Sequence, residues 1–296
     1  MKMHDGEIDI DVALVSALID GQLPQLAHLP VRPVASTGTV NAIFRVGDEL
    51  YARLPRVEEW AGDLDKESLW LPRLGGAGLS LQLPEPVAPG IPTSRYPLPW
   101  AIYRWIDGEP YTDAGVRDES EAAADLARFV TGLRRLDPAG APRAGRRPLR
   151  ELDAATREAI RAASALIDGN GALAAWERSV DAPAWTGTPV WIHADLLRPN
   201  VLVSGGRLRA ILDWGGAGIG DPAADVIAAW TLFGPVGRDA YRNALSVDND
   251  TWNRSRGFAL HQAAMIIPYY RETNPAFVAQ ALRTVEQVIA EAASTT

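Results

Sequence analysis

Apolar and polar residues follow two different periods in the first part of the chain. Residues 31–55 alternate with a period of two and are interrupted by a turn at Gly47-Asp48, a pattern typical of short strands joined by tight turns. Residues 8–20 and 58–74 repeat their apolar positions at the helical period, and Gly75-Gly76 ends the second of these segments. We therefore expect a small antiparallel sheet of three strands, with one helix before it and one after it.

The pattern changes after a proline-rich stretch. Seven prolines between Leu83 and Pro110 disfavour helix and suit edge strands with tight turns. The apolar run from Trp100 to Ile106 is expected to be a strand that leaves the small sheet. Apolar residues then recur at helical spacing over 119–136, 152–180 and 254–292. The pattern predicts an α+β chain with two lobes, a β-rich N-terminal lobe (1–103) and a larger, mainly helical C-terminal lobe (104–296).

Composition narrows the class of protein. Of 296 residues, 47% are hydrophobic and 22% charged, which is typical of a folded globular chain. The formal net charge of -8 disfavours a nucleic-acid partner and suits a cationic small substrate. The absence of cysteine excludes disulfides, thiolate catalysis and cysteine-bound metals. Acidic residues interrupt the first apolar stretch, and no apolar run reaches membrane length, so we expect a cytoplasmic protein without a membrane partner. We also expect a monomer or weak homodimer.

A short strand-rich segment interrupts the helical half of the chain. Strand-type triplets at 190–192 and 201–203, a Gly205-Gly206 turn and a returning strand at 208–212 bracket several polar residues. His193, Asp195, Asn200 and Asp213 should therefore gather at the ends of short strands. Phosphoryl transfer to a hydroxyl needs a carboxylate to receive the proton, oxygen ligands for Mg²⁺, and donors to the phosphates. Asp195, Asn200 and Asp213 can supply the first two.

The segment HADLLRPNVLVSGGRLRAILDWGGAGIGDPAADV closely resembles the core of the aminoglycoside phosphotransferase family, which shares the protein-kinase-like fold. Weaker resemblance extends across nearly the whole chain. The resemblance implies a Mg²⁺-dependent kinase that uses ATP or GTP, with Asp195 as the catalytic base and Asn200 and Asp213 as the Mg²⁺ ligands. It also implies that His193 organises the catalytic loop, rather than carrying a proton, and that Asp225 anchors that loop.

The N-terminal half is similar to the nucleotide-binding lobe of the same family. Arg53 stands on the strand where such kinases carry a phosphate-binding lysine, and Glu67 stands where its ion-pair partner would be. The other nucleotide-binding residues that the resemblance implies are a covering loop and a hinge against the nucleobase: Ser36, Thr37, Gly38, Thr39; Tyr103, Trp105, Ile106. Two alternatives stay open here. In the first, Arg53 and Glu67 are merely solvated charges. In the second, Tyr103 or Trp105 belongs to the core between the lobes and does not contact a nucleobase.

Several rival motifs lack their structural context. Gly218–Ala223 spells a dinucleotide-binding fingerprint, but the chain that follows it has a helical pattern instead of a βαβ unit. Lys2 and Lys66, the only lysines, do not follow a glycine, so no P-loop is present. The sequence contains no G-x-S-x-G motif, and its histidines lack the spacing of zinc ligands. Nucleotide oxidoreductase, hydrolase and zinc-enzyme functions are therefore disfavoured.

The acceptor is the least determined part of the prediction. The resemblance points to a hydroxyl of an aminoglycoside or related amino sugar, with macrolides, choline, homoserine and sugars as alternatives. A non-catalytic nucleotide-binding pseudokinase is a further alternative, motivated by Arg53 in the lysine position. Acidic residues that are candidates for contact with a cationic acceptor are Asp153, Glu158, Asp168, Glu177, Asp181 and Glu272.

Overall fold

The computed structural model describes residues 6–35 and 40–294. It divides into two compact units, one formed by 1–108 with 210–215 and the other by 109–209 with 216–296. The chain passes from the second unit to the first within strand β9 (Arg207–Ile211). The first unit is built on an antiparallel sheet and the second is mainly helical, so the predicted α+β class is confirmed.

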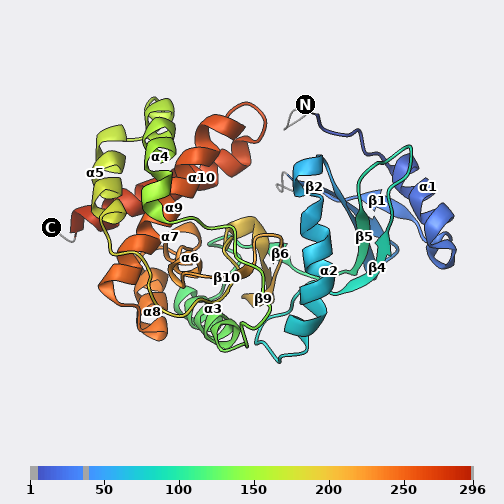
Figure 1. The fold of residues 1–296 in the computed structure, drawn as a ribbon, viewed down its shortest axis with the longest axis horizontal. Coiled ribbons are helices and arrows are strands. Elements are labelled where there is room, and N and C mark those ends of the chain that lie inside the picture. The colour runs from blue at the N-terminus through green and yellow to red at the C-terminus, as the bar shows by residue number, and fades with distance from the viewer. Residues whose placement is uncertain (1–5, 36–39, 295–296) are drawn as a thin grey trace. The chain divides into compact units, whose positions relative to one another are not determined.

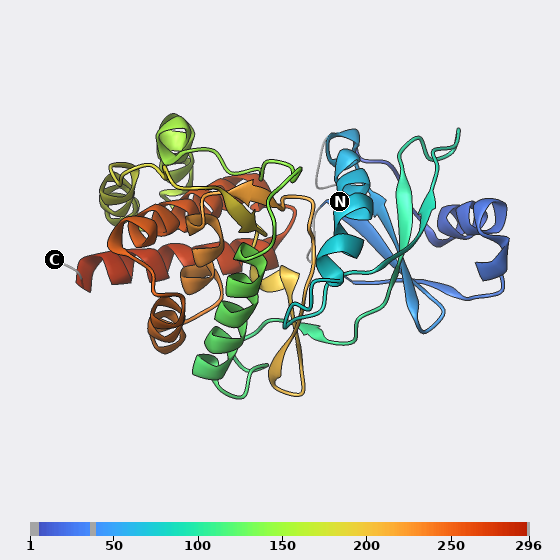
Figure 2. The same cartoon turned by 60° about the horizontal axis from the view of Figure 1, so that its bottom comes forward.

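The first unit is a five-stranded antiparallel sheet with a helix on each side of it (Figures 1 and 2). In spatial order the strands are β1 (Val31–Pro33), β2 (Asn41–Val46), β3 (Leu50–Pro55), β5 (Trp100–Arg104) and β4 (Pro86–Gly90). The helices are α1 (Val12–Gln22) and α2 (Gly62–Gly75), with single 3₁₀ turns at Pro24–Leu26 and Glu58–Trp60. The three strands predicted from residues 31–55 are present, and the proline-bearing β4 lies at the sheet edge, where a strand can lack donors. The opening helix begins at Val12, where the Asp11 carboxylate caps it, and not at residue 8.

The alternation of side chains along the strands divides this sheet into an apolar face and a polar one. Phe44, Ala52 and Ile102 belong to one buried cluster with the apolar residues of α1. Their sequence neighbours on the strands, which include Arg53 and Tyr103, point to the opposite face, because successive side chains alternate across a strand. Arg53 and Tyr103 therefore share one face of the sheet and meet Glu67 of α2 there.

The second unit is a helical assembly around α9, which lies among α4, α5, α6 and α10 (Figure 1). Its helices are α3 (Glu119–Arg134), α4 (Leu149–Ala163), α5 (Gly169–Val180), α6 (Ala223–Val226), α7 (Ala228–Thr231), α8 (Pro235–Leu245), α9 (Asn249–Tyr270) and α10 (Pro275–Ser294). The helical pattern over 254–292 thus belongs to two helices, because Asn274 precedes a new helix start at Pro275. Within the described residues, no helix combines the length and apolar character needed to cross a membrane.

Two small sheets interrupt the helices of the second unit. Strand β7 (Val190–Ile192) pairs with β10 (Gly218–Gly220), and β8 (Val201–Ser204) lies between β6 (Glu109–Pro110) and β9. Gly205 and Gly206 both have positive φ, at 60° and 79°, as a tight hairpin between β8 and β9 requires. The glycine-rich stretch from Gly218 is a strand, which the sequence pattern did not predict, and Pro222 occupies the N-cap position of α6.

Candidate active site

The loop from His193 to Asn200 connects β7 with β8 and is anchored by a buried carboxylate. Asp225, fully buried at the start of α6, accepts hydrogen bonds from the backbone N–H groups of His193 at 3.0 Å and Ala194 at 2.8 Å. The Tyr241 hydroxyl donates to the carbonyl oxygen of Asp225 at 3.1 Å. Asp225 therefore anchors the loop, as the sequence predicted, and a buried carboxylate without these donors would be costly.

The backbone before Asp195 is held in an uncommon conformation. Ala194 has φ of 69°, in the left-handed region that residues other than glycine seldom adopt. The N–H of Asp195 donates to Nδ1 of the buried His193 at 3.3 Å, so Nδ1 acts as the acceptor and His193 closes the turn. This contact fits the loop-organising role expected of His193, and such strain at one residue is common at functional sites.

Two neutral amides hold the Asp195 carboxylate. Asn200 Nδ2 donates to Asp195 Oδ2 at 2.7 Å and to the Asp195 carbonyl oxygen at 3.0 Å. Gln262 Nε2, from α9, donates to Asp195 Oδ1 at 2.5 Å. Both donors are neutral amides, so they orient the carboxylate without placing a positive charge at either contact. Because the NH₂ group of Asn200 faces Asp195, its side-chain oxygen is directed elsewhere and remains a suitable metal ligand.

Arg146 supports both the loop and the amide of Gln262. Its Nε donates to the carbonyl oxygen of Ala194 at 2.9 Å, and its Nη2 donates to Gln262 Oε1 at 2.6 Å. Burial lowers the pKa of Arg146, and the carboxylates of Asp195 and Asp225 oppose that shift. Arg146 still stays charged, because an arginine side chain does not deprotonate at physiological pH.

In the first unit, Arg53 of β3 and Glu67 of α2 form a buried ion pair. Arg53 Nη1 lies 2.7 Å from Glu67 Oε1 and 2.6 Å from Oε2, and the side chains are 6% and 0% exposed. The alternative that these residues are solvated surface charges is therefore wrong. A fully buried pair needs this kind of geometry, because the attraction must offset the desolvation of both charges.

The other arm of Arg53 holds Asp213. Arg53 Nη2 donates to Asp213 Oδ1 at 2.8 Å, and the amide oxygen of Asn41, when turned toward the guanidinium, accepts from Nε at 3.1 Å and Nη2 at 3.0 Å. Both arms and the Nε of Arg53 are thus engaged by protein groups. Burial acts to lower the pKa of Arg53, but the charges of Glu67 and Asp213 outweigh it, so the pKa of Arg53 is raised. Asp213 itself has φ of 61°, and its Oδ2 has no hydrogen-bond partner among the described residues.

Helix α2 also fixes the turn that follows Asp213. The Trp214 N–H donates to Glu67 Oε1 at 2.8 Å, and Lys66 Nζ donates to the carbonyl oxygen of Gly215 at 2.5 Å. A Cβ atom at Gly215 would come within 2.5 Å of Asp63 Oδ2, so a larger residue there would require the Asp63 side chain to move. The Asp-Trp-Gly sequence is therefore held to α2 at each of its last two residues.

The expected nucleobase-contacting segment is partly core. Tyr103 is fully buried, stacks on Tyr51 at 5.2 Å and donates its hydroxyl to Glu67 Oε2 at 2.8 Å. Burial, together with Glu67, raises the pKa of Tyr103, so the hydroxyl remains a donor. Trp105 and Ile106 are partly buried, and the Trp105 N–H donates to the Glu49 carbonyl oxygen at 2.7 Å. The expected covering loop, Ser36, Thr37, Gly38 and Thr39, lies outside the described residues.

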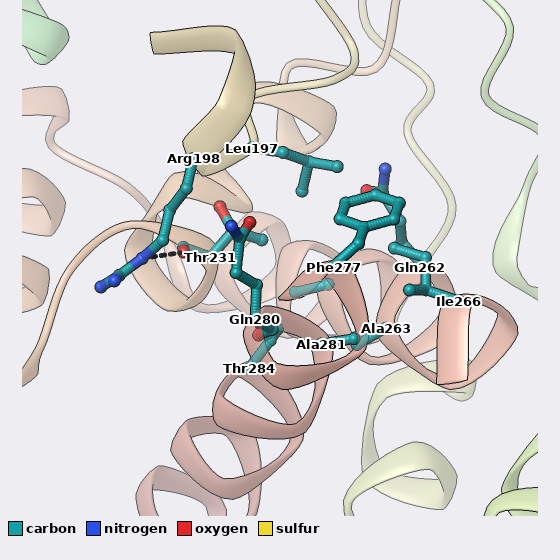
Figure 3. A pocket seen from close by; sticks show the side chains of 11 residues that line it. Leu197, Arg198, Thr231, Gln262, Ala263, Ile266, Phe277, Gln280, Ala281 and Thr284 are labelled. Atoms are coloured by element: carbon teal, nitrogen blue, oxygen red, sulfur yellow. Dashed lines mark hydrogen bonds between the residues drawn. The ribbon is translucent and has the colours of Figure 1, made fainter. Parts of the chain in front are cut away.

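A cavity lies beside the catalytic loop in the second unit (Figure 3). It holds about 290 Å³ of empty space, part of it open to solvent. Leu197 and Arg198 of the loop form one part of its wall, and residues of α9 and α10, with Thr231, form the rest. The lining residues are Leu197, Arg198, Thr231, Ala259, Gln262, Ala263, Ile266, Phe277, Gln280, Ala281 and Thr284. None of them is a carboxylate.

The acidic residues suggested for acceptor binding lie elsewhere. Asp153 accepts from Trp176 Nε1 at 2.6 Å and from Arg157, and Asp168 caps α5. Glu177 and Asp181 pair with Arg157 and Arg150. Glu272 lies 3.8 Å from Arg271, and none of the six lines the cavity. These contacts assign structural roles to most of the set.

Asp213 of the first unit and Asn200 of the second each carry an oxygen of the kind that binds Mg²⁺. Asp213 is a carboxylate whose Oδ2 has no hydrogen-bond partner among the described residues, and Asn200 is an amide whose NH₂ group faces Asp195. Mg²⁺ is usually bound by one or two carboxylates and by substrate phosphates. Among the described residues, no group of three or more His, Asp or Glu side chains has the arrangement of a metal site.

Sequence patterns did not reveal Gln262 or Arg146. Gln262 lies 67 residues from Asp195, and Arg146 lies 116 residues from Gln262. A lone glutamine on an apolar helix and an arginine in a proline-rich loop carry no spacing signal. Only the fold brings these side chains to the catalytic loop.

Comparison with known proteins identifies the family. Residues 31–258 match the model of the phosphotransferase enzyme family. Viomycin phosphotransferase of Streptomyces vinaceus is 31% identical over 207 residues, which cover 64% of this chain and 71% of that protein. The uncharacterized protein YcbJ of Bacillus subtilis (strain 168) is 30% identical over 159 residues, 50% of this chain and 48% of YcbJ, so that match spans about half of its length.

Solved structures share the fold over nearly their whole length. The GDP complex of an aminoglycoside 2'-phosphotransferase IIIa mutant superimposes with a TM-score of 0.75 at 23% identity, covering 96% of this chain and 99% of that one. The macrolide 2'-phosphotransferase MphH of Brachybacterium faecium gives 0.59 at 19% identity, covering 93% and 97%. The chain therefore belongs to the phosphotransferase enzyme family and has the aminoglycoside-phosphotransferase form of the protein-kinase-like fold, as the sequence predicted.

Proposed function

We propose that this protein transfers the γ-phosphoryl group of a Mg²⁺-bound ATP or GTP to a hydroxyl of a small molecule. The observation that carries the proposal is the setting of Asp195, whose carboxylate is held by two amide donors on a loop anchored by Asp225. A base must be fixed in direction and must still be able to accept a proton, and this arrangement meets both needs.

In the proposed reaction, Asp195 accepts the proton of the acceptor hydroxyl. The hydroxyl oxygen forms a bond to the γ-phosphorus as the bond between that phosphorus and the bridging oxygen breaks, and the nucleoside diphosphate leaves with the bridging oxygen. Asp213 and Asn200 would hold Mg²⁺, which when bound neutralises charge on the phosphate oxygens. His193 keeps the loop in shape through its contact with the Asp195 N–H.

The nucleotide is assigned to the first unit. We assign the phosphate side to Arg53, Glu67 and the loop Ser36–Thr39, and the nucleobase side to Tyr103, Trp105 and Ile106. Because Arg53 is engaged by Glu67, Asp213 and Asn41, its main task is to fix Glu67 and Asp213 in place. Such a reaction draws on the nucleotide pool of the cytoplasm, where we place the protein as a monomer or weak homodimer.

An aminoglycoside or related amino sugar is the first candidate for the acceptor. The named relative is a viomycin phosphotransferase, and one structural neighbour, at 22% identity and a TM-score of 0.74, is a complex with GDP and kanamycin. The net charge of -8 suits a cationic compound.

A specific observation favours a second candidate. The cavity beside the catalytic loop has no carboxylate in its lining and includes Ile266, Phe277 and several alanines. An acceptor with many ammonium groups would find no ionic partner on these side chains, whereas an apolar face would be buried favourably. Macrolide phosphotransferases are among the structural neighbours, so a macrolide is the second candidate.

The test is acceptor-dependent release of nucleoside diphosphate. Wild type and Asp195→Ala are assayed with Mg²⁺ and ATP or GTP against kanamycin, gentamicin, viomycin and a macrolide, with Asp181→Ala as an exposed-carboxylate control. We expect turnover with at least one acceptor and a loss of about 10²–10⁴-fold in Asp195→Ala, the usual contribution of a general base. Equal rates in wild type and Asp195→Ala would refute the assigned base, and nucleotide binding without any turnover would favour a pseudokinase.

A further inference from the structure

The geometry points to Gln262, held in place by Arg146, as a positioning residue that sets the direction of the Asp195 carboxylate. This inference rests on the proposed function, because it takes Asp195 as the base. Neither Gln262 nor Arg146 was suggested by any sequence motif. Their contacts with the catalytic loop give them a role.

The contacts form a continuous chain from a charged group to the base. Arg146 Nη2 donates to Gln262 Oε1 at 2.6 Å, and Gln262 Nε2 donates to Asp195 Oδ1 at 2.5 Å. Arg146 Nε donates at the same time to the carbonyl oxygen of Ala194, the residue just before Asp195. One guanidinium therefore fixes both the backbone that carries the base and the amide that meets its side chain.

The role of Gln262 follows from the two oxygens of the carboxylate. Asn200 donates to Oδ2 and Gln262 to Oδ1, so rotation about the Cβ–Cγ bond of Asp195 would break both contacts. With Gln262 removed, the contact at Oδ1 that resists this rotation is lost. A misdirected base lowers the rate of the chemical step more than it lowers nucleotide affinity, because orientation contributes to the barrier itself.

The amide suits this position better than a charged group would. Arg146 is already close to the loop, and a direct guanidinium–carboxylate contact would be a strong charge-assisted pair. The interposed amide of Gln262 orients the Asp195 carboxylate through a neutral donor. Hydrogen bonds that are linked in a chain also strengthen one another. Arg146 fixes which end of the amide faces Asp195, because a guanidinium can only donate and so selects Oε1.

Gln262 also connects the base to the cavity. Its side chain lies among those that line the cavity, on a helix with Ala259, Ala263 and Ile266 in the same wall (Figure 3). A compound that fills the cavity would therefore contact the residue that orients Asp195. The helix supplies a rigid support, since Ala259 and Ala263 are buried.

The first test is a kinetic comparison of variants with similar shape. Gln262→Met keeps the volume and loses the donor, and Gln262→Glu keeps the shape but places a second carboxylate against Asp195. We expect kcat to fall about tenfold to hundredfold in Gln262→Met and further in Gln262→Glu, with KM for the nucleotide within about twofold of wild type. Gln287→Met, which removes the glutamine bonded to Arg238, is the matched control and should leave kcat unchanged. A packing role alone would predict that Gln262→Met keeps the wild-type kcat, and that result would overturn the inference.

The second test does not depend on turnover. The side-chain amide signal of Gln262 is identified in an ¹⁵N spectrum by its loss in Gln262→Met, and its hydrogen exchange is measured in wild type, Asp195→Ala and Arg146→Met. We expect slow exchange in wild type and faster exchange in both variants. If the amide responds but wild type turns over no acceptor, the positioning contact stands and the proposed function fails. If turnover depends on Asp195 but the hydrogen exchange of the Gln262 amide is the same in both variants as in wild type, the inference is wrong and the proposed function stands.

Discussion

The carboxylates of Asp195 and Asp213 occupy similar local settings but are held by opposite kinds of partner. Each lies shortly after a strand; Asp195 follows a residue with left-handed backbone, Ala194 with φ of 69°, and Asp213 is itself such a residue, with φ of 61°. Neutral amides of Asn200 and Gln262 hold Asp195, whereas the guanidinium of Arg53 holds Asp213. Both carboxylates thus lie at or next to a residue with strained backbone, but the donors that hold Asp195 are neutral and the donor that holds Asp213 is charged.

That difference separates the two proposed roles. A guanidinium against Asp213 favours the ionised carboxylate and fixes one oxygen, while Oδ2 keeps its capacity for a metal. The amides of Asn200 and Gln262 orient Asp195 and place no positive charge at either contact. This suits a carboxylate that must accept a proton in the reaction. The partner of each carboxylate, more than its position after a strand, therefore indicates its task.

The largest effect is expected at Asp213. Asp213→Asn keeps the shape but loses the charge that pairs with Arg53 and that, in the proposed mechanism, holds the metal. We expect turnover with Mg²⁺ to fall by about 10³-fold, about 4 kcal/mol in the barrier, since charge stabilisation by a metal is a dominant contribution. Steady-state rates over a range of Mg²⁺ concentrations measure this, and an unchanged Mg²⁺ dependence would remove Asp213 from the metal site.

A smaller effect is expected from Arg53→Lys, the residue that kinases of this fold usually carry. One ammonium group cannot replace a fork that meets Glu67 on one arm and Asp213 on the other. We expect about 2 kcal/mol of lost stability from the buried pair and a roughly tenfold fall in kcat/KM for the nucleotide. Urea unfolding and steady-state kinetics measure the two effects. Higher activity in Arg53→Lys would show that the double contact of Arg53 with Glu67 and Asp213 is not required for the reaction.

The smallest effect concerns acid stability in the unit that carries Asp195. Burial, with help from Arg146 and Arg147, lowers the pKa of His261 from 6.5 to about 4. The folded state therefore favours neutral His261, so its contribution is fully present above pH 6.5 and is lost as the pH falls toward 4. Between about pH 7.5 and about pH 5 we expect a loss of about 2 kcal/mol of stability.

His261→Gln tests this contribution. The Thr156 hydroxyl donates to the Leu152 carbonyl, so His261 Nδ1 donates to Thr156 Oγ1 at 2.8 Å, and glutamine can offer a similar donor. Hydrogen exchange of peptides from each unit should show a weaker acid response in 109–209 and 216–294 of the variant. The same response in wild type and variant would assign the acid sensitivity to other groups.

The sequence predicted those parts of the site that lie close together along the chain. The His193–Asn200 loop, the hairpin after it and Asp213 are separated by short strands, so period-two patterns and turn residues were sufficient to locate them. The pairing of Arg53 with Glu67 also followed from the family resemblance, and the structure confirms it.

Long-range contacts could not be predicted in this way. The Gln262–Asp195 and Arg146–Gln262 contacts depend on how α9 packs against the catalytic loop, which no local pattern encodes. Strand β10 was missed because Gly218–Gly220 has too few side chains to show an alternation, and its pairing with β7 supplies the order. The polar contacts of the suggested acidic residues likewise depend on tertiary structure. Because the sequence does not show these contacts, the residues appeared available for an acceptor.

The most direct test of the two roles is calorimetric titration of nucleotide, with and without Mg²⁺, into wild type, Asp195→Asn and Asp213→Asn. The account predicts that Asp195→Asn binds the Mg²⁺ nucleotide as wild type does but does not turn it over. It also predicts that Asp213→Asn binds nucleotide equally with and without Mg²⁺. Loss of the Mg²⁺ effect in Asp195→Asn, with its retention in Asp213→Asn, would contradict the assignment of base and metal ligand.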